Sequence, residues 1–249
     1  QAIDTDELKK VHMEELERFK RVQSKEQDQR DLAIEDMKFV NAVDGQWEDD
    51  AATKRANRPR YTINRVAPAI DQLVGDQRQN RTQIKVRPVS TGADEDTAEI
   101  FGGLIRNIEA QSKAENAYDG AYDEQTTGGY GGWRLVTEFN DDDSFEQDIR
   151  IKPVPSAASS LFLDPAITEY DGRDAKWGFL INWIEHEEFE EEFPDASKIN
   201  FPINQYYNPN CGAWFDNKMM QVAEYWVKTP VERTILLLSD GRVIDKDDE

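Results

Sequence analysis

The 249-residue sequence has few of the residues that build most catalytic and metal centres. It contains one cysteine, Cys211, and two histidines, His12 and His186. A single cysteine cannot form an intramolecular disulfide, which favours a reducing compartment. The sequence has no His-Glu-x-x-His motif, and two histidines are a poor basis for a histidine metal site or a Ser-His-Asp triad. Only Asp/Glu pairs remain as acid–base candidates, and nothing in the sequence singles out one pair. We expect no cofactor and no metal.

Long apolar runs are also missing. The longest, Phe179–Ile184 and Ile235–Leu238, fall far short of the roughly 20 residues that a membrane-spanning helix needs. No signal-peptide pattern is visible, and we expect no membrane partner. Because the chain begins at Gln1 and ends in the charged run 245–249, we expect a piece of a longer polypeptide, truncated at its C-terminus.

Positive charge is scarce, since 30 lysines and arginines oppose 51 acidic residues, for a net charge of −21. Such a surface repels nucleic acid and opposes uncontrolled self-association. The 33% charged and 38% apolar content is typical of disorder, but six Trp, eight Tyr and eleven Phe argue against it. The composition therefore predicts a folded, acidic protein with large solvated faces.

One stretch reverses this charge. Between Arg58 and Arg87, seven basic residues oppose Asp71 and Asp76, so the stretch is +5 and the remainder of the chain −26. These cations could contact phosphates, or could form the positive half of an interface with the acidic surface of a neighbouring copy. The charge of the remainder favours the interface hypothesis. We call the seven residues the basic band: Arg58, Arg60, Arg65, Arg78, Arg81, Lys85 and Arg87.

The same stretch has its own local signals. Asn64 is a suitable helix N-cap, and Pro68 falls in the first turn, where a missing N–H costs little. An apolar stripe then predicts a helix that Gly75 ends. Farther on, Ile84 and Val86 alternate with polar residues, which predicts a half-buried strand.

The other elements change in type near 128. Helical periodicity predicts two helices within 4–43, divided by the polar run 27–31, and a third from 97 to 112 that bends and continues to about 122. The third has an apolar stripe of Ile100, Leu104, Ile105 and Ile108. Gly128–Gly132 resembles a phosphate loop only in composition, because it lacks the following Lys-Ser/Thr, and a helix C-cap explains it better.

Strand signals follow from 133 to 245. We expect strands at 133–139, 145–152 and 175–184, and a pair, 220–228 with 231–239, joined across Thr229-Pro230. Asp240-Gly241 predicts a further hairpin, and 195–217 a loop. A short acidic helix at 185–193 completes the list. We expect the face formed by Trp177, Phe179, Ile181 and Trp183 to be core.

Helices first and antiparallel strands later predict an α+β fold, with N-terminal and central long helices packed on a mostly antiparallel β-sheet. We divide the chain into an N-terminal helical segment, 1–57, and an α+β domain, 58–249.

Three strings give the sequence a family resemblance. They are RPRYTINRVAPAIDQLVGDQRQNRTQIKVRPV (58–89), DEDTAEIFGGLIRNIEAQSKAENAYDGAYDEQTTGGYGGWRLVTEF (94–139) and FLDPAITEYDGRDAKWGF (162–179). In this order they resemble the portal proteins, or head-to-tail connectors, of short-tailed bacteriophages, over roughly residues 58 to 184. The 58–249 domain would correspond to the wing-like outer part of the portal subunit.

The resemblance implies a structural role rather than catalysis. Portal subunits form a ring, typically of twelve copies, at one vertex of the capsid. The ring passes double-stranded DNA during packaging and ejection, and the implied partners are the terminase large subunit, capsid and scaffolding proteins and a tail adaptor. The implied location is the virion, and the host cytoplasm during assembly. From the charge of −21 we expect weak or no direct DNA binding by this chain.

Two alternatives stay open at this point. One is a carboxylate- and metal-dependent nuclease or hydrolase of phage origin, which would need acidic side chains gathered within reach of one metal ion. The acidic run Asp141–Asp143 lacks the spacing of a known cation loop and fits a solvated turn better. The other is a peripheral tail-adaptor protein without a channel.

Overall fold

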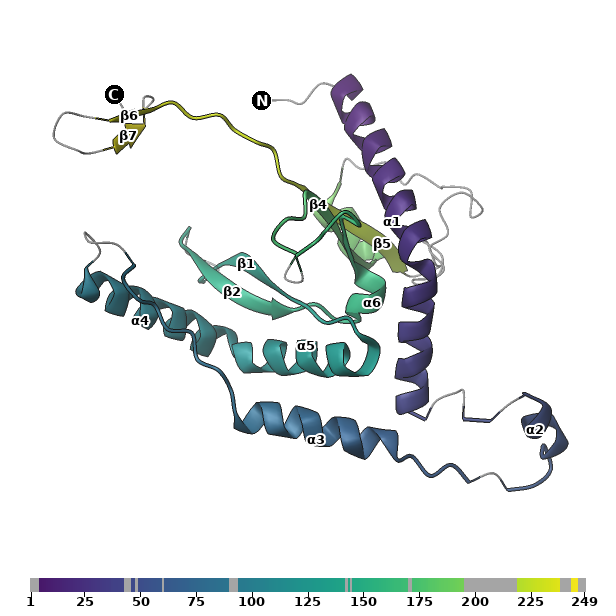
Figure 1. The fold of residues 1–249 in the computed structure, drawn as a ribbon. Coiled ribbons are helices and arrows are strands. Elements are labelled where there is room, and N and C mark those ends of the chain that lie inside the picture. Colours follow the sequence, from purple (N-terminus) through teal and green to yellow (C-terminus); the bar gives the residue numbers. More distant parts are fainter. Residues whose placement is uncertain are drawn as a thin grey trace.

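Helices form the first half of the chain, as the 3.6-residue periodicity predicts. The computed structural model describes residues 5–42, 46–47, 49–59, 61–89, 94–141, 143, 145–169, 172–194, 219–237 and 243–245. Helix α5 lies at the centre, with α1 across one end and α3 alongside it (Figure 1). The helices of this half are α1 (Thr5–Val40), α2 (Asp49–Lys54), α3 (Val66–Gln79), α4 (Glu95–Ser112) and α5 (Ala114–Gly128).

Antiparallel strands dominate the second half. β1 (Trp133–Phe139) and β2 (Gln147–Pro153) form a hairpin. β3 (Leu161–Leu163), β4 (Trp177–Glu185) and β5 (Met219–Val227) form a three-stranded sheet, and β6 (Ile235–Leu237) pairs with β7 (Val243–Asp245). Two short helices, α6 (Ala157–Ser160) and α7 (His186–Glu192), flank β3 and β4. The predicted α+β class is confirmed, but the strands form three separate sheets instead of one.

Backbone chemistry explains where α3 and α4 begin and where α5 ends, and it confirms the predicted cap at Asn64 and the predicted stop after Gly128. The Asn64 side-chain oxygen accepts hydrogen bonds from the N–H groups of Val66 (3.1 Å) and Ala67 (3.0 Å) at the start of α3. Asp94 caps α4 in the same way. The bend between α4 and α5 occurs at Lys113, with φ 49°, and Gly129, with φ 79°, ends α5 in the left-handed region that glycine tolerates.

The main core lies where α1 crosses the three-stranded sheet. Phe19 and Val22 of α1 pack against Phe162, Phe179 and other buried residues of the sheet. The ring of Phe19 meets those of Phe162 and Phe179 edge-on, with centroids 5.2 Å and 5.5 Å apart. This packing attaches the N-terminal helix to strands more than 140 residues later in the sequence.

A buried arginine strengthens the same junction. Only 2% of Arg30 is exposed, and its guanidinium lies 3.9 Å from the Phe162 ring centroid. It donates to the carbonyl oxygens of Ala158 (2.5 Å) and Leu161 (2.8 Å), and it forms a 2.6 Å ion pair with Glu26. The charge is therefore paired and hydrogen-bonded, as a buried charge must be.

Two expectations for the helices were wrong. Residues 5–40 form one helix instead of two, because the polar run 27–31 is bridged by side-chain pairs four residues apart, such as Gln27 with Asp31. Gly75 does not end α3, which continues to Gln79. A lone glycine weakens a helix by only about 1 kcal/mol, which the flanking turns tolerate.

The predicted strand at Ile84–Val86 is also absent. Residues 81–89 are neither helix nor strand, and Ile84 is 53% exposed. The alternation of apolar and polar residues is present, but no other strand within the described part of the chain pairs with it. A strand needs a partner as well as a pattern.

Two strand expectations need correction. β5 pairs with β4 along its whole length instead of with 231–239. Among the described residues of that stretch, 231–237, only β6 is a strand, and it pairs with β7. The predicted loop 195–217 and the Asp240-Gly241 turn lie outside the described residues.

Trp183 is not core, since it is 42% exposed, whereas Trp177, Phe179 and Ile181 are buried. The cluster in which α1 covers β4 contains Trp177, Phe179 and Ile181 together with Phe19 and Val22, but Trp183 lies outside it.

Phe162 and Trp183 give a matched test of this core. Phe162→Ala removes a side chain with no exposed surface and should lower the free energy of unfolding by about 3–5 kcal/mol. Trp183→Ala should lower it by less than about 1 kcal/mol, because that ring keeps much of its contact with water. Urea unfolding of the two variants measures both values, and equal losses would contradict the assignment of the core.

Candidate subunit interface

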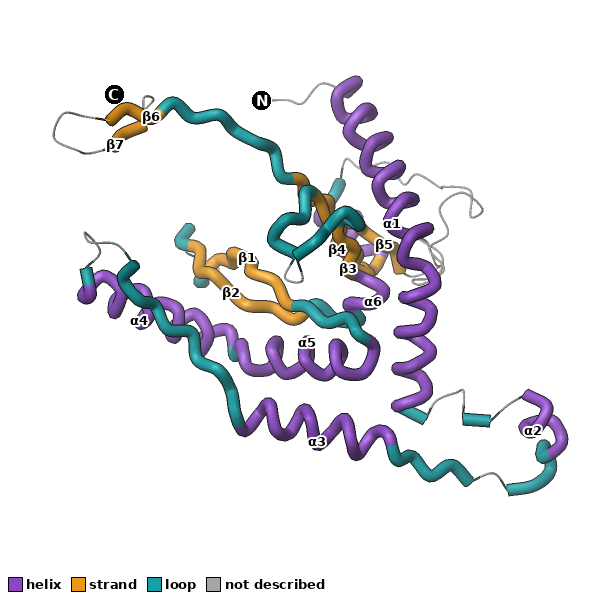
Figure 2. The backbone as a smooth tube through the Cα atoms, in the orientation of Figure 1, coloured by secondary structure: helices purple, strands orange, loops and turns teal. Residues whose placement is uncertain are grey.

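The basic band follows α3 and its two flanking segments. α3 is flanked by non-helical residues on both sides, 55–59 and 61–65 before it and 80–89 after it (Figure 2). It packs on α5, and its exposed apolar residues include Val66 and Leu73. α3 is therefore a separate arm that α5 holds in place.

Two members of the band are used within the chain. The Arg78 guanidinium lies 3.2 Å from a carboxylate oxygen of Asp119 on α5, and Arg81 donates to the same oxygen at 2.7 Å. Arg81 also forms an ion pair with Glu115, and the hydrogen bond from its guanidinium to that carboxylate raises the pKa of Arg81 above its ordinary value. The other oxygen of Asp119 is buried without a hydrogen-bond partner in the described structure. We call this group the α3–α5 ion-pair cluster.

Four members stay available to other molecules. Arg58, Arg65, Lys85 and Arg87 are exposed, and none forms an ion pair with another residue that the structure describes. Arg60 lies outside the described residues. The sequence thus located a cationic stretch but could not show which of its charges are neutralised inside the chain, since the acidic partners lie 34 to 41 positions away.

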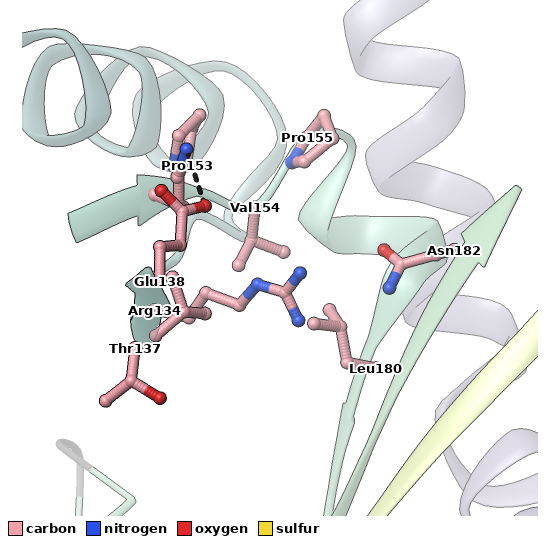
Figure 3. A pocket seen from close by; sticks show the side chains of 10 residues that line it. Arg134, Thr137, Glu138, Pro153, Val154, Pro155, Leu180 and Asn182 are labelled. Carbon is pink, nitrogen blue, oxygen red and sulfur yellow. Dashed lines mark ion pairs between the residues drawn. The ribbon is translucent and has the colours of Figure 1, made fainter. Parts of the chain in front are cut away.

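The structure adds two hollows that the sequence did not predict. A cavity of about 520 Å³ separates the β1–β2 hairpin from β4 and is lined by Arg134, Glu138, Leu180, Asn182 and neighbours (Figure 3). Arg134 reaches across it to Glu224 of β5, with 2.6 Å between the charged atoms. The dashed line in Figure 3 is the 3.0 Å ion pair of Glu138 with Lys152.

The second hollow is wider and more apolar. It has a volume of about 960 Å³ and lies between β1 and the outer parts of β4 and β5. Its lining includes Leu135 and Trp226, which are 62% and 67% exposed. We call it the β1 groove. The alternation along β1 could have indicated a half-exposed strand, but only the tertiary fold places β5 opposite.

The comparisons with known proteins identify the family. The family model described as phage P22-like portal protein matches residues 16–249. The chain belongs to this family. It is also similar to the curated portal protein of Acyrthosiphon pisum secondary endosymbiont phage 1, with 28% identity over 229 residues.

The alignment covers unequal shares of the two portal proteins. It includes 88% of this chain but 31% of the phage relative, so the chain spans about a third of that protein's length. The resemblance to portal proteins found in the sequence is confirmed, and the family is a structural one.

Two further findings concern the alternatives. Among the residues of the portal chain that the structure describes, no three His, Cys, Asp or Glu side chains come close enough to hold a metal ion. In the same set of residues, every helix is too short or too polar to cross a bilayer.

The α3–α5 ion-pair cluster can be tested by amide hydrogen exchange. Asp119→Asn removes the carboxylate that Arg78 and Arg81 share, so α3 should open more often. For a partly exposed cluster we expect about 1 kcal/mol of local stability, which is about fivefold faster exchange in α3. Asp123→Asn is the matched control, because Asp123 lies exposed on α5 without an ion pair to a described residue. Equal exchange in both variants would contradict the role of Asp119.

Proposed function

We propose that this chain is part of a structural, non-enzymatic subunit of a phage portal ring. The family match over residues 16–249 is the observation that supports this most directly. In this proposal the ring has the twelve copies that are typical of portal proteins, stands at one capsid vertex of the virion, and conducts double-stranded DNA during packaging and ejection. Assembly takes place in the host cytoplasm.

The proposed partners follow from that position. They are further copies of the subunit, the terminase large subunit, capsid and scaffolding proteins, and a tail adaptor. The division into a helical segment, 1–57, and a wing-like domain, 58–249, stays a prediction within this proposal.

Helix α4 supports a role in assembly. It has the amphipathic pattern of a packed helix, yet none of its residues is buried. Ile100, Phe101 and Leu104 are 71%, 53% and 50% exposed. An apolar helix face of this kind marks a surface that a partner covers, because monomers rarely leave such patches in water.

The alternatives have less support. A nuclease or hydrolase would need a cluster of acidic metal ligands, and the described residues contain none. The family match is to portal proteins, and it gives no support to a tail adaptor without a channel.

Electron microscopy of the intact protein that contains this chain tests the proposal. We expect closed rings with a central channel wide enough for duplex DNA, because head-to-tail contacts between identical subunits close by rotational symmetry. Particles that remain monomeric, or that form compact assemblies without a channel, would contradict the proposal.

DNA binding gives a second test, and we predict that this chain binds duplex DNA weakly or not at all. Its charge of −21 repels a polyanion within about 8 Å at physiological salt. The measurement is fluorescence anisotropy of a labelled duplex at several salt concentrations.

A dedicated phosphate track would give a different result. If Arg58, Arg65, Lys85 and Arg87 each contacted a phosphate, the logarithm of affinity would fall with the logarithm of salt with a slope of about −3.6. Submicromolar binding with such a slope, lost in Lys85→Glu and Arg87→Glu, would make the band a DNA contact. Arg78 and Arg81 are unsuitable for this test, because their substitution also disrupts the α3–α5 ion-pair cluster.

A further inference from the structure

Residues 82–89 form a strand-like segment without a partner. The segment has the alternating sequence Thr-Gln-Ile-Lys-Val-Arg-Pro-Val, and all of it is exposed. No backbone hydrogen bond joins it to another described residue. Backbone groups in a segment with this alternating pattern are suited to a sheet, and here they pair with no described strand.

The β1 groove offers the complementary feature, an open sheet edge. β1 pairs only with β2 among the strands that the structure describes. The outer edge of β2 is covered, since the N–H of Ile151 donates to the Ser112 hydroxyl at the end of α4 (3.0 Å). On the outer side of β1, no described residue forms a backbone hydrogen bond of this kind.

The orientation of the β1 backbone follows from this bond. Because the N–H of Ile151 points away from β1, the opposite residue, Leu135, also directs its N–H and C=O outward. By alternation Thr137 does the same. Five consecutive residues of β1, 133–137, line the groove. Because successive side chains of a strand point to opposite faces, a groove lined by consecutive residues runs along the edge of β1.

We propose that residues 82–87 of one copy add to the outer edge of β1 in a second copy, as an extra strand in the β1 groove. This inference rests on the proposed function in one respect, the identity of the partner as another copy of this chain. The contact is a β-strand addition, in which main-chain hydrogen bonds give affinity and side-chain pockets give register. Ile84 and Val86 would enter the groove between Leu135 and Trp226.

Charge supports a second copy as the occupant. Residues 82–87 contain two basic residues, Lys85 and Arg87, and no acidic one, whereas residues 138–148, at the turn end of the hairpin, contain six acidic residues and no basic one. Glu138 and Asp148 are already paired with Lys152 and Arg150, and the hairpin from 133 to 153 still has a net charge of −3. Opposite charges on two different surfaces favour head-to-tail association over random contact.

Geometry also favours a partner chain over the same chain. α3 and the β1–β2 hairpin lie on opposite sides of α5 (Figure 1), and Arg81 holds the start of the segment to α5. Two unlike surfaces on one subunit produce a heterologous contact, the type that closes into a ring. The lengths agree as well, since the segment offers six residues to the seven of β1.

Photocrosslinking in the intact protein tests the proposal. A benzophenone amino acid replaces Lys85, and light and isotopically heavy subunits are assembled together so that mass spectrometry recognises links between copies. We expect links to the tryptic peptide 135–150, at least about tenfold above those from a probe at Lys54, since a docked strand raises the local concentration of its target. Lys54 is the control because it is exposed on α2, away from the segment.

The outcomes separate this proposal from the ring itself. Rings that form without links from position 85 to 135–150 overturn the strand addition and leave the portal function standing. Links within one copy overturn it too. Failure of the intact protein to form any ring contradicts the proposed function, independently of the crosslink pattern.

Proline substitution gives a second, independent readout. Successive residues of an edge strand point their N–H groups in opposite directions, so only one of Lys85→Pro and Val86→Pro should remove a hydrogen bond to β1. We expect one variant to lose most of the crosslink from a probe at Gln83 and the other to keep it. Neither substitution breaks a hydrogen bond within the described part of the subunit. Equal crosslinking in both variants would exclude a paired strand.

Discussion

Close packing on helix α5 is the constraint on which the rest of the structure depends. α5 contacts α1, α3, α4, α6, β1 and β2, and small residues let these elements approach. Ala114 and Ala117 are buried against Ile151 of β2. A Cβ on Gly128 would lie 2.7 Å from the end of the Met37 side chain and 3.2 Å from the Ala33 carbonyl oxygen of α1, so a larger residue would require Met37 to move and α1 to shift slightly. Polar groups of α5 complete the attachment, since the Glu124 carboxylate accepts from the N–H groups of Ser156 and Ala157.

A central helix with thin layers around it leaves much apolar surface uncovered. Sheets of two or three strands have two edges each, and they cannot bury both faces of every strand. Here the open edge of β1, the exposed face of α4 and the unpaired segment 82–89 are the places where this shortage appears. In the proposed ring, neighbouring copies would cover such surfaces.

Electrostatics favours particular pairs of surfaces for the proposed contacts between copies. The body of the chain is strongly acidic, so like surfaces repel and only the basic band can face an acidic neighbour at low cost. Arg78 and Arg81 form ion pairs with Asp119 within the subunit and hold α3 against α5. Lys85 and Arg87, which follow α3, stay exposed. An acidic body also suits a DNA conduit, because every cation on phosphate adds affinity that opposes movement.

The sequence alone determined the features that depend on neighbours along the chain. Periodicity gave α4, α5 and the β1–β2 hairpin, and short-range side-chain chemistry gave the Asn64 and Asp94 caps and the turn at Gly129. Only the tertiary structure decided the features that depend on distant partners. Trp183 is exposed because it lies outside the cluster that α1 covers, the 82–87 pattern makes no strand because no described strand pairs with it, and two arginines of the basic band are neutralised because α5 lies against α3. Alternating apolar and polar residues show that a segment can form a half-buried strand. Whether it does so depends on which elements the tertiary fold places beside it.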